Sequence, residues 1–313
     1  MSGSVVMEIG SSVRSIMIAR ARSGSKRGSR SDGHHLSLVI ESGGMRGVAA
    51  GGFIKVLADA ALTDTFDSIH GSSAGACAAA YFLAGQANLG LKIYEDIATR
   101  EVVNPLRFLS QPCIVDTDYI ADVLMAKKWK LDAQPIISEP GVLNVTTTSA
   151  TDGLPVIHNR FRTAEELLLA LKASLRVPGP LEPGVLIEGR RHLDGALIAP
   201  MPLFSAAAAG ATHILAVCTQ RVQDYTESSR VIAILEGAAV GAMYGRALMN
   251  RYIAAHGADR RILGSGVVIP TDFLIRPASA THCGRLTIDV SILAKVEAES
   301  AEAARAYLRG DTA

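Results

Sequence analysis

The residues that most limit what this chain can fold into are 71–75, which read G-S-S-A-G. A serine between two glycines at this spacing is typical of a nucleophile elbow, where the serine stands on a sharp turn between a strand and a helix. Such a turn crowds the backbone on both sides, and Gly71 and Gly75 relieve the crowding because they carry no side chain. The pattern makes Ser73 the candidate nucleophile.

The residues on either side of the motif agree with that prediction. Residues 66–69 suit a short buried strand, and the alanine-rich residues 76–82 favour helix. The motif alone is not specific, because a chain with 29 glycines can match so short a pattern by chance. A Gly/Ser-rich turn in an ordinary α/β protein is therefore the alternative at this point.

A second glycine-rich turn lies earlier in the chain, at residues 42–47. Residues 36–40 precede it as a buried strand would, and residues 48–60 follow with helical spacing. Such a turn directs backbone N–H groups at one point, which suits a phosphate, a carboxylate or a developing oxyanion. A dinucleotide-binding motif needs glycine where Ser42 stands, and the Gly-Lys-Ser/Thr ending of a Walker loop is absent, so a phosphate loop is disfavoured.

An aspartate followed by glycine ends a predicted hairpin in the second half of the chain. Residues 185–187 and 191–193 are expected to pair across a two-residue turn, and Asp194, Gly195 and Ala196 follow directly. The glycine lets the chain bend close to its neighbours. Asp194 is therefore placed to face a site rather than the core.

Strand and helix patterns alternate along the rest of the chain. Such alternation predicts an α/β fold of three layers, α/β/α, with a largely parallel central sheet and ligands at the carboxyl ends of its strands. Ser73, Asp194 and the loop at 43–47 all lie at such ends. Further strands are expected at 142–149, 213–218 and 267–269, and further helices at 88–101, 116–128, 163–171, 231–255 and 286–308.

Length and cysteine usage restrict the class of protein further. A chain of 313 residues is long enough for one large α/β domain. Its four cysteines have no C-x-x-C spacing, which argues against a zinc site and a disulfide framework and fits a reducing compartment. We therefore expect a cytoplasmic protein with no metal and no cofactor. No apolar run reaches the roughly 18 residues that a membrane-spanning helix needs.

Residues 1–33 differ from the rest in charge. They carry six basic and two acidic residues, a net charge of +4 in a chain whose total is +1. Their Ser/Gly/Arg composition predicts a disordered basic tail ahead of a single domain at 34–313. Three alternatives stay open for the tail: a transit-like segment, a patch in peripheral contact with an anionic membrane, or an overlong start before Met7 or Met17. No nucleic-acid partner is expected.

Taken in order, three of these motifs resemble the patatin-like phospholipase family. They are the E-S-G-G-M-R-G of residues 41–47, the G-S-S-A-G of 71–75 and the D-G-A of 194–196. The resemblance runs from about residue 36 to 217. It includes an Ala-Ser…Pro turn of bacterial members, at Ala173, Ser174 and Pro178.

The resemblance implies an activity and the residues that carry it. It implies a lipid acyl hydrolase of the phospholipase A or lysophospholipase type, with Ser73 as nucleophile and Asp194 as its catalytic partner. A carboxylate with a pKa of about 4 is a weak base for a hydroxyl, but burial raises that pKa and direct contact aligns the proton transfer. Water then releases the acyl-enzyme, so the reaction needs a lipid ester and no metal.

The same resemblance assigns the first glycine loop to the oxyanion. Backbone N–H groups near Gly43 and Gly44 would hold it, and Arg46 matches the basic position of the family's loop. That loop usually opens with three glycines, and here the first is Ser42. If the position needs a positive φ, a serine is strained there. The loop is completed by Met45 and Gly47.

Two other functions stay open on the sequence. An α/β-hydrolase triad has the chain order Ser…Asp…His, which Ser73, Asp194 and His282 satisfy, but it leaves the early glycine loop and the D-G-A turn unexplained. A catalytically idle lipid-binding protein is the second, suggested by the altered first glycine of the loop. The sequence does not specify which lipid ester is cleaved.

Overall fold

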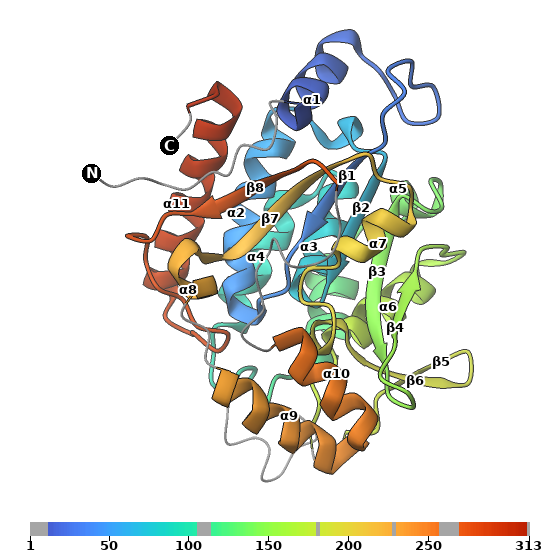
Figure 1. The fold of residues 1–313 in the computed structure, drawn as a ribbon, viewed down its shortest axis with the longest axis vertical. Coiled ribbons are helices and arrows are strands. Elements are labelled where there is room, and N and C mark those ends of the chain that lie inside the picture. The colour runs from blue at the N-terminus through green and yellow to red at the C-terminus, as the bar shows by residue number, and fades with distance from the viewer. Residues whose placement is uncertain (1–11, 105–113, 180–181, 227–229, 257–268, 312–313) are drawn as a thin grey trace.

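The computed structural model describes residues 12–104, 114–179, 182–226, 230–256 and 269–311. Within them, eight strands form one sheet (Figure 1). The strands are β1 Leu36–Ile40, β2 Ser68–Ser72, β3 Leu143–Ser149, β4 Pro155–His158, β5 Val185–Ile187, β6 Arg190–Asp194, β7 His213–Arg221 and β8 Thr271–Arg276. Their order across the sheet is β5-β6-β3-β2-β1-β7-β8, and β4 pairs with β3.

The sheet is parallel over most of its width and antiparallel at one edge. β1 runs parallel to β2 and β7, β2 runs parallel to β3, and β7 runs parallel to β8. β4 and β6 run antiparallel to β3, and β5 and β6 form the predicted hairpin. The largely parallel sheet is confirmed, but Asp194 is delivered by a strand that runs against its neighbour.

Helices cover both faces of the sheet, which confirms the three-layer α/β/α architecture. One face carries α2 Gly47–Asp59, α3 Ala74–Leu83, α6 Ala164–Leu175 and α11 Val290–Arg309, with α4 Ala87–Ile97 and the π-helical η4 Tyr119–Lys128 outside them. Side chains of β1 alternate between the two faces of the sheet. Leu38 and Ile40 pack with this layer, and Val39 packs against α7, at residues 203–208, on the other face. The other elements are α1 Ser12–Ser23, η1 Gly44–Arg46, η2 Thr63–Thr65, α5 Gln134–Ile137, η5 Gly195–Leu197, α7 Leu203–Ala208, α8 Val222–Thr226, α9 Arg230–Tyr244 and α10 Arg246–His256.

The N-terminal segment differs from the predicted disordered tail. Residues 1–11 lie outside the described residues, but α1 packs on the core with Val13 and Met17 fully buried. Arg20, on the same face of α1, pairs with Asp32 and Asp67 at 2.7 Å each. The prediction judged this segment by its average composition, whereas burial depends on one face of a single helix. The described residues on both sides of position 33 therefore share one core.

The predicted helix at 231–255 is two antiparallel helices. Gly245, with a φ of +90°, ends α9, and α10 begins at the next residue. The two helices pack closely, because Gly237 and Gly241 of α9 lie against Ile253 and Met249 of α10. The strand predicted at 267–269 falls partly outside the described residues, and β8 begins two residues later, at Thr271.

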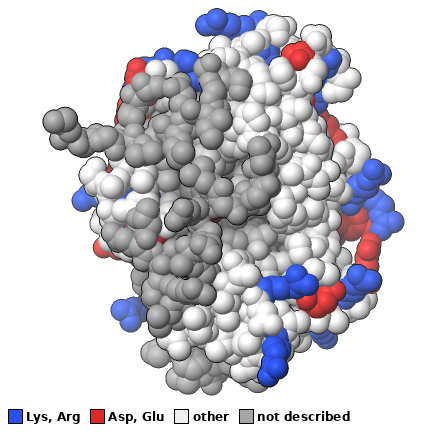
Figure 2. Space-filling view, viewed as in Figure 1, with Lys and Arg blue, Asp and Glu red and all other residues white. Residues whose placement is uncertain are grey.

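Two observations concern the surface and the length of the helices. In Figure 2, the basic and acidic side chains of the described residues lie mostly near the edge of the visible face, where the two kinds are mixed and form no continuous basic patch. None of the helices in the described ranges is both long enough and apolar enough to cross a membrane.

Candidate active site

Ser73 stands on the turn between the last residue of β2 and the first residue of α3. Its φ is +55°, in a left-handed region that is costly for a residue with a side chain. A Cβ atom added at Gly71 would lie 2.5 Å from the carbonyl oxygen of Gly75, and one added at Gly75 would lie 2.5 Å from that of Ile40. Glycine at both positions lets the turn pack against α3 and β1. The structure has the predicted order of strand, turn and helix, with Ser73 in the turn.

The Ser73 hydroxyl donates a hydrogen bond to the Asp194 carboxylate, with 2.8 Å between Oγ and Oδ2. Asp194 is the last residue of β6, and its other oxygen, Oδ1, accepts the backbone N–H of Ala196 at 2.7 Å. Gly195 and Ala196 begin η5, so the D-G-A turn holds the Asp194 carboxylate in place through the N–H of Ala196. Ser73 and Asp194 are each only 6% exposed, which shields the pair from water.

The environment of Asp194 changes its acidity. Burial raises the pKa of this carboxyl to about 6, and the hydrogen bonds from Ala196 and Ser73 and the charge of Arg285 act in the opposite direction. A carboxylate with this pKa is a stronger base than an exposed one, and it is still ionised at neutral pH. The pair can therefore pass a proton from the hydroxyl to the carboxylate.

The loop between β1 and α2 supplies hydrogen-bond donors beside this pair. The backbone N–H groups of Gly43 and Gly44 have no partner among the described residues, whereas that of Ser42 donates to the carbonyl of Pro200 at 2.8 Å. The N–H of Met45 donates to the carbonyl of Arg285 at 3.0 Å. Gly43 and Gly44 are thus the two loop residues whose N–H groups can receive an anionic oxygen.

The serine that replaces the usual first glycine is not strained. In the loop at 42–47, Gly44 is the residue with a φ in the left-handed region, at +57°. Ser42 is buried, and its carbonyl accepts the hydroxyl of Thr219 at 2.8 Å. Glu41 accepts both the N–H and the hydroxyl of the same threonine, at 2.7 and 2.8 Å. The loop is anchored to β7 with serine at 42, and its conformation requires glycine at 44.

Arg46 and Gly47 support the loop and do not line the cavity beside Ser73. The Arg46 guanidinium donates to the side-chain oxygen of Gln220 at 2.7 Å. Gly47 lies so close to the hydroxyl of Tyr94 that an added Cβ would overlap it. The basic position of the loop is therefore directed at β7 rather than at the candidate nucleophile.

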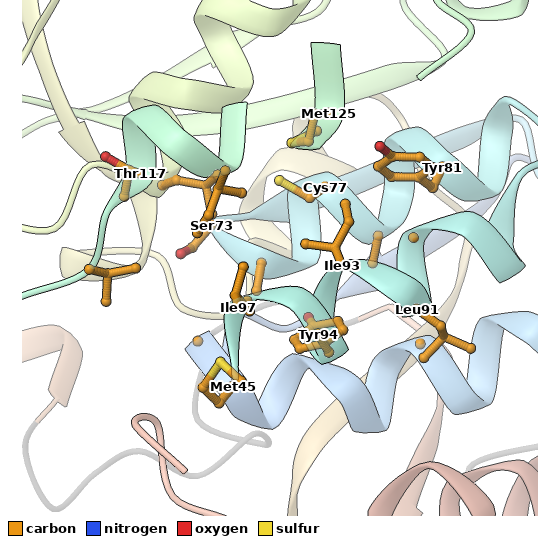
Figure 3. Close-up of a pocket in the computed structure, with 18 of the residues that line it drawn as sticks. Met45, Ser73, Cys77, Tyr81, Leu91, Ile93, Tyr94, Ile97, Thr117 and Met125 are labelled. Atoms are coloured by element: carbon orange, nitrogen blue, oxygen red, sulfur yellow. The ribbon is translucent and has the colours of Figure 1, made fainter. Parts of the chain in front are cut away.

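An apolar cavity opens beside Ser73. It encloses about 800 Å³ when the space at its open mouth is included, and it lies between α2, α3, α4 and η4. Figure 3 shows Ser73 at one side of this cavity and Tyr81 and Leu91 at the other. Burial raises the pKa of the Cys77 thiol, which also lines it, to about 12, so that thiol is uncharged. The cavity suits a hydrocarbon chain.

A family model for the patatin-like phospholipases matches residues 38–207, more than half of the chain. The chain belongs to the patatin-like phospholipase family. An uncharacterized protein of Escherichia coli strain K12, YjjU, is 28% identical over 193 residues, which are 61% of this chain and 53% of YjjU. The chain thus spans about half the length of that relative. The chain also superposes on the crystal structure of VipD from Legionella pneumophila. The superposition covers 88% of this chain and 67% of the VipD chain, with 13% sequence identity and a TM-score of 0.45.

The structure does not bring His282 to Ser73. Its side chain is 68% exposed, and its Nδ1 lies 3.2 Å from the Arg221 guanidinium and 3.9 Å from Asp224. Among the described residues, no hydrogen bond joins a histidine to Ser73 or Asp194 and no acidic, His or Cys cluster is placed to hold a metal ion.

Two residues around the site, His256 and Arg285, belong to none of the sequence motifs, and Ser174 makes a contact that its motif does not specify. The hydroxyl of Ser174 accepts the backbone N–H of Ser73 at 2.8 Å. His256, from α10, lies 2.8 Å from the carbonyl of Ala196 through its Nε2. Arg285 borders the mouth of the cavity. His256 and Arg285 follow the matched residues by many positions, so no local spacing pointed to them.

Proposed function

We propose that this protein is a serine lipid acyl hydrolase of the phospholipase A or lysophospholipase type, in which Ser73 is the nucleophile and Asp194 the general base. The observation that carries the proposal is the 2.8 Å hydrogen bond from the Ser73 hydroxyl to Asp194, between two nearly buried side chains. The adjoining apolar cavity supports a fatty acyl substrate. The family supports the same class of reaction.

In the first half of the proposed reaction, Ser73 is acylated. The Ser73 oxygen forms a bond to the ester carbonyl carbon while its proton passes to Asp194 Oδ2. The carbonyl oxygen becomes an oxyanion, which the N–H groups of Gly43 and Gly44 stabilise. The bond to the leaving alcohol then breaks, and the alcohol takes the proton from Asp194. Asp194 is again a carboxylate, and the acyl group is esterified to Ser73.

In the second half, water releases the acyl group. Asp194 takes a proton from a water molecule whose oxygen attacks the acyl carbon, and the same N–H groups hold the second oxyanion. The bond to Ser73 breaks, and the Ser73 oxygen recovers the proton from Asp194. The products are a fatty acid and the regenerated pair. The pKa of about 6 suits Asp194 to both transfers, since it accepts and returns a proton near neutral pH.

The setting proposed for this reaction is the cytoplasmic side of a membrane, contacted peripherally, with a lipid ester as partner and no nucleic acid or metal. Cys77, Cys218 and Cys283 are free thiols, which supports a reducing compartment. The unit proposed to act is a single patatin-like domain, the predicted 34–313, extended by α1 because that helix shares its core.

A serine-directed fluorophosphonate probe with peptide mapping tests the proposal. The wild type should be labelled at Ser73 and should hydrolyse a short-chain ester, and Ser73→Ala should lose both properties. Ser72→Ala is the matched control, because it removes the neighbouring buried hydroxyl, which has no partner among the described residues. Asp194→Asn should lose activity on the order of 10²-fold or more, as expected for loss of a general base.

The same assay separates the alternatives. A folded wild type that binds lipid, resists the probe and has no esterase activity is an idle lipid-binding protein. A folded His282→Ala variant without activity supports the Ser73-Asp194-His282 triad instead.

A further inference from the structure

The mouth of the cavity carries a positive charge that the proposed reaction does not use. Of the described residues that line the cavity, Arg285 is the one with a charged side chain. It is exposed together with Gly44, whereas Tyr81, Leu91 and Ile93 at the inner end are buried. An acyl chain with its ester at Ser73 would extend inward, so the rest of the lipid would leave past Arg285.

Arg285 is held against the oxyanion loop by its own backbone. It lies in the connection between β8 and α11, and its carbonyl accepts the N–H of Met45 at 3.0 Å. Gly44 approaches the same carbonyl so closely that an added Cβ would lie 2.7 Å from it. The connection is fixed again at Thr281, whose hydroxyl donates to Glu299 of α11 at 2.6 Å. These contacts fix the backbone of Arg285 beside the oxyanion loop.

The guanidinium of Arg285 is not neutralised by a direct ion pair. Among the described residues no carboxylate forms an ion pair with the guanidinium. The charge of Arg285 also reaches Asp194, since it favours the ionised form of that carboxyl. A cation near the reacting pair that has no carboxylate partner can attract a second anion.

We propose that Arg285 forms an anion subsite for the phosphate of a lipid head group. The inference rests on the proposed function and adds to it the kind of alcohol that leaves. In a glycerophospholipid the phosphate is separated from the scissile ester by a few covalent bonds, so it would lie just outside the mouth when the acyl chain is inside. Arginine suits this task because its planar guanidinium donates two parallel hydrogen bonds to phosphate. Arg46, the loop cation, is occupied by Gln220.

The test compares two esters with the same acyl chain, a lysophospholipid and a neutral monoacylglycerol, both as monomers. The measured quantity is the ratio of their kcat/KM values, because any effect of the substitution on Asp194 changes both and cancels. Arg285→Gln should lower the ratio on the order of 10- to 100-fold, the range for one lost charge-assisted hydrogen bond. Arg285→Lys should retain part of it. Arg246→Gln, an exposed arginine on α10 outside the cavity lining, should leave the ratio unchanged.

Inorganic phosphate distinguishes the two sources of the anion. If the subsite binds the lipid phosphate, millimolar phosphate inhibits wild-type monoacylglycerol hydrolysis weakly at most, and the lipid ratio depends on Arg285. Strong competitive inhibition by phosphate, lost in Arg285→Gln with an unchanged lipid ratio, would overturn the lipid assignment in favour of a free phosphate.

Two further outcomes identify which proposal fails. Equal loss on both esters in a folded Arg285→Gln variant would overturn the subsite and leave Ser73 and Asp194 in place. A wild type that hydrolyses neither ester and resists the fluorophosphonate probe would overturn the proposed function. Binding of monomeric dodecyl phosphate to Ser73→Ala, measured by calorimetry, then still tests the subsite, because Arg285→Gln in that background must weaken it.

Discussion

Ser174 accepts a hydrogen bond from the backbone N–H of Ser73, with 2.8 Å between Oγ and N. The same hydroxyl donates to the carbonyl of Thr146 on β3 at 2.7 Å, and the residue is fully buried. One side chain at the end of α6 thus ties the strained elbow to the neighbouring strand. A backbone held at a φ of +55° persists where its surroundings restrain it, and Ser174 is part of that restraint.

Replacing Ser174 by alanine should therefore affect both folding and catalysis. The buried N–H of Ser73 would lose its acceptor, which costs about 1–3 kcal/mol in the free energy of unfolding. The elbow would also be less firmly held, so kcat should fall more than KM rises. Urea unfolding and steady-state kinetics measure the two effects. Ser300→Ala in α11 also removes a buried hydroxyl, one that bonds Val296, and should leave kcat intact; an equal loss of kcat in both variants would contradict the role of Ser174.

The pH dependence of activity should report the ionisation of Asp194. Because burial raises the pKa of this carboxyl to about 6, the base is ionised above that pH and protonated below it. We expect kcat/KM of the wild type to fall with a slope of one below about pH 6. His282→Ala should have the same profile, since that histidine contacts Arg221 rather than the reacting pair. A profile that loses its acid limb in His282→Ala would assign the ionisation to the histidine.

The raised pKa of Asp194 also lowers the stability of the folded protein at pH values above 6. Its pKa is about 6 in the folded protein against an ordinary value near 4, so folding favours the protonated carboxyl and loses stability as the pH rises through 6. Two pKa units correspond to a penalty on the order of 3 kcal/mol at pH 8. Asp194→Asn should therefore have a Tm equal to or above that of the wild type at pH 8, and this advantage should shrink as the pH is lowered toward 4. The same Tm difference at both pH values would contradict it.

The elements that carry the site could be predicted because their signals are local. The strand at 36–40, the glycine turn and the helix after it are each determined by neighbouring residues, and the structure has them as β1, η1 and α2. The roles of Ser73 and Asp194 stay predictions, but the meeting of their side chains at 2.8 Å agrees with the motif order. The sequence alone leaves open whether Ser42 has a strained backbone. In the structure it does not, because the residue of this loop with a left-handed φ is Gly44.

What the sequence did not indicate depends on contacts between distant residues. The burial of Arg20 requires Asp67, which lies 47 positions along the chain. The direction of β6 depends on its pairing with β3, because a hairpin pattern does not specify the strand it joins. Arg285 is near the candidate site only because the connection before α11 crosses the oxyanion loop. Composition and periodicity describe neighbouring residues, so they do not predict the burial of Arg20, the direction of β6 or the position of Arg285.

Gly44→Ala should reduce activity more than stability. Its φ of +57° disfavours a side chain, and the added Cβ would lie 2.7 Å from the carbonyl oxygen of Arg285, so the loop must move. Gly85→Ala is a matched control, because Gly85 has a similar φ of +69° with nothing within 4 Å of an added Cβ. We expect Gly85→Ala to lose about 1 kcal/mol in the free energy of unfolding. Gly44→Ala should lose more, because it adds the overlap with a backbone carbonyl, and it alone should lose kcat. Full activity in a folded Gly44→Ala would remove this loop from the proposed oxyanion site.

Arg20→Ala should destabilise the whole domain, which tests whether α1 belongs to the core. The Arg20 side chain is 1% exposed, and its guanidinium bonds Asp32 and Asp67 and donates to the carbonyl of Thr65 at 2.7 Å. Removing it leaves Asp67, itself 13% exposed, without that partner. Breaking a buried ion pair from one side costs on the order of 3 kcal/mol, measured as the change in the free energy of unfolding.

Arg22→Ala provides the control for Arg20→Ala, since Arg22 is an exposed arginine on the same helix and carries the same charge. Its loss should change the free energy of unfolding by no more than about 0.5 kcal/mol. The expected result is a large difference between the two variants in a single cooperative transition, because α1 and the sheet share one core. Equal, small effects would mean that the N-terminal segment is dispensable, as a disordered tail would be.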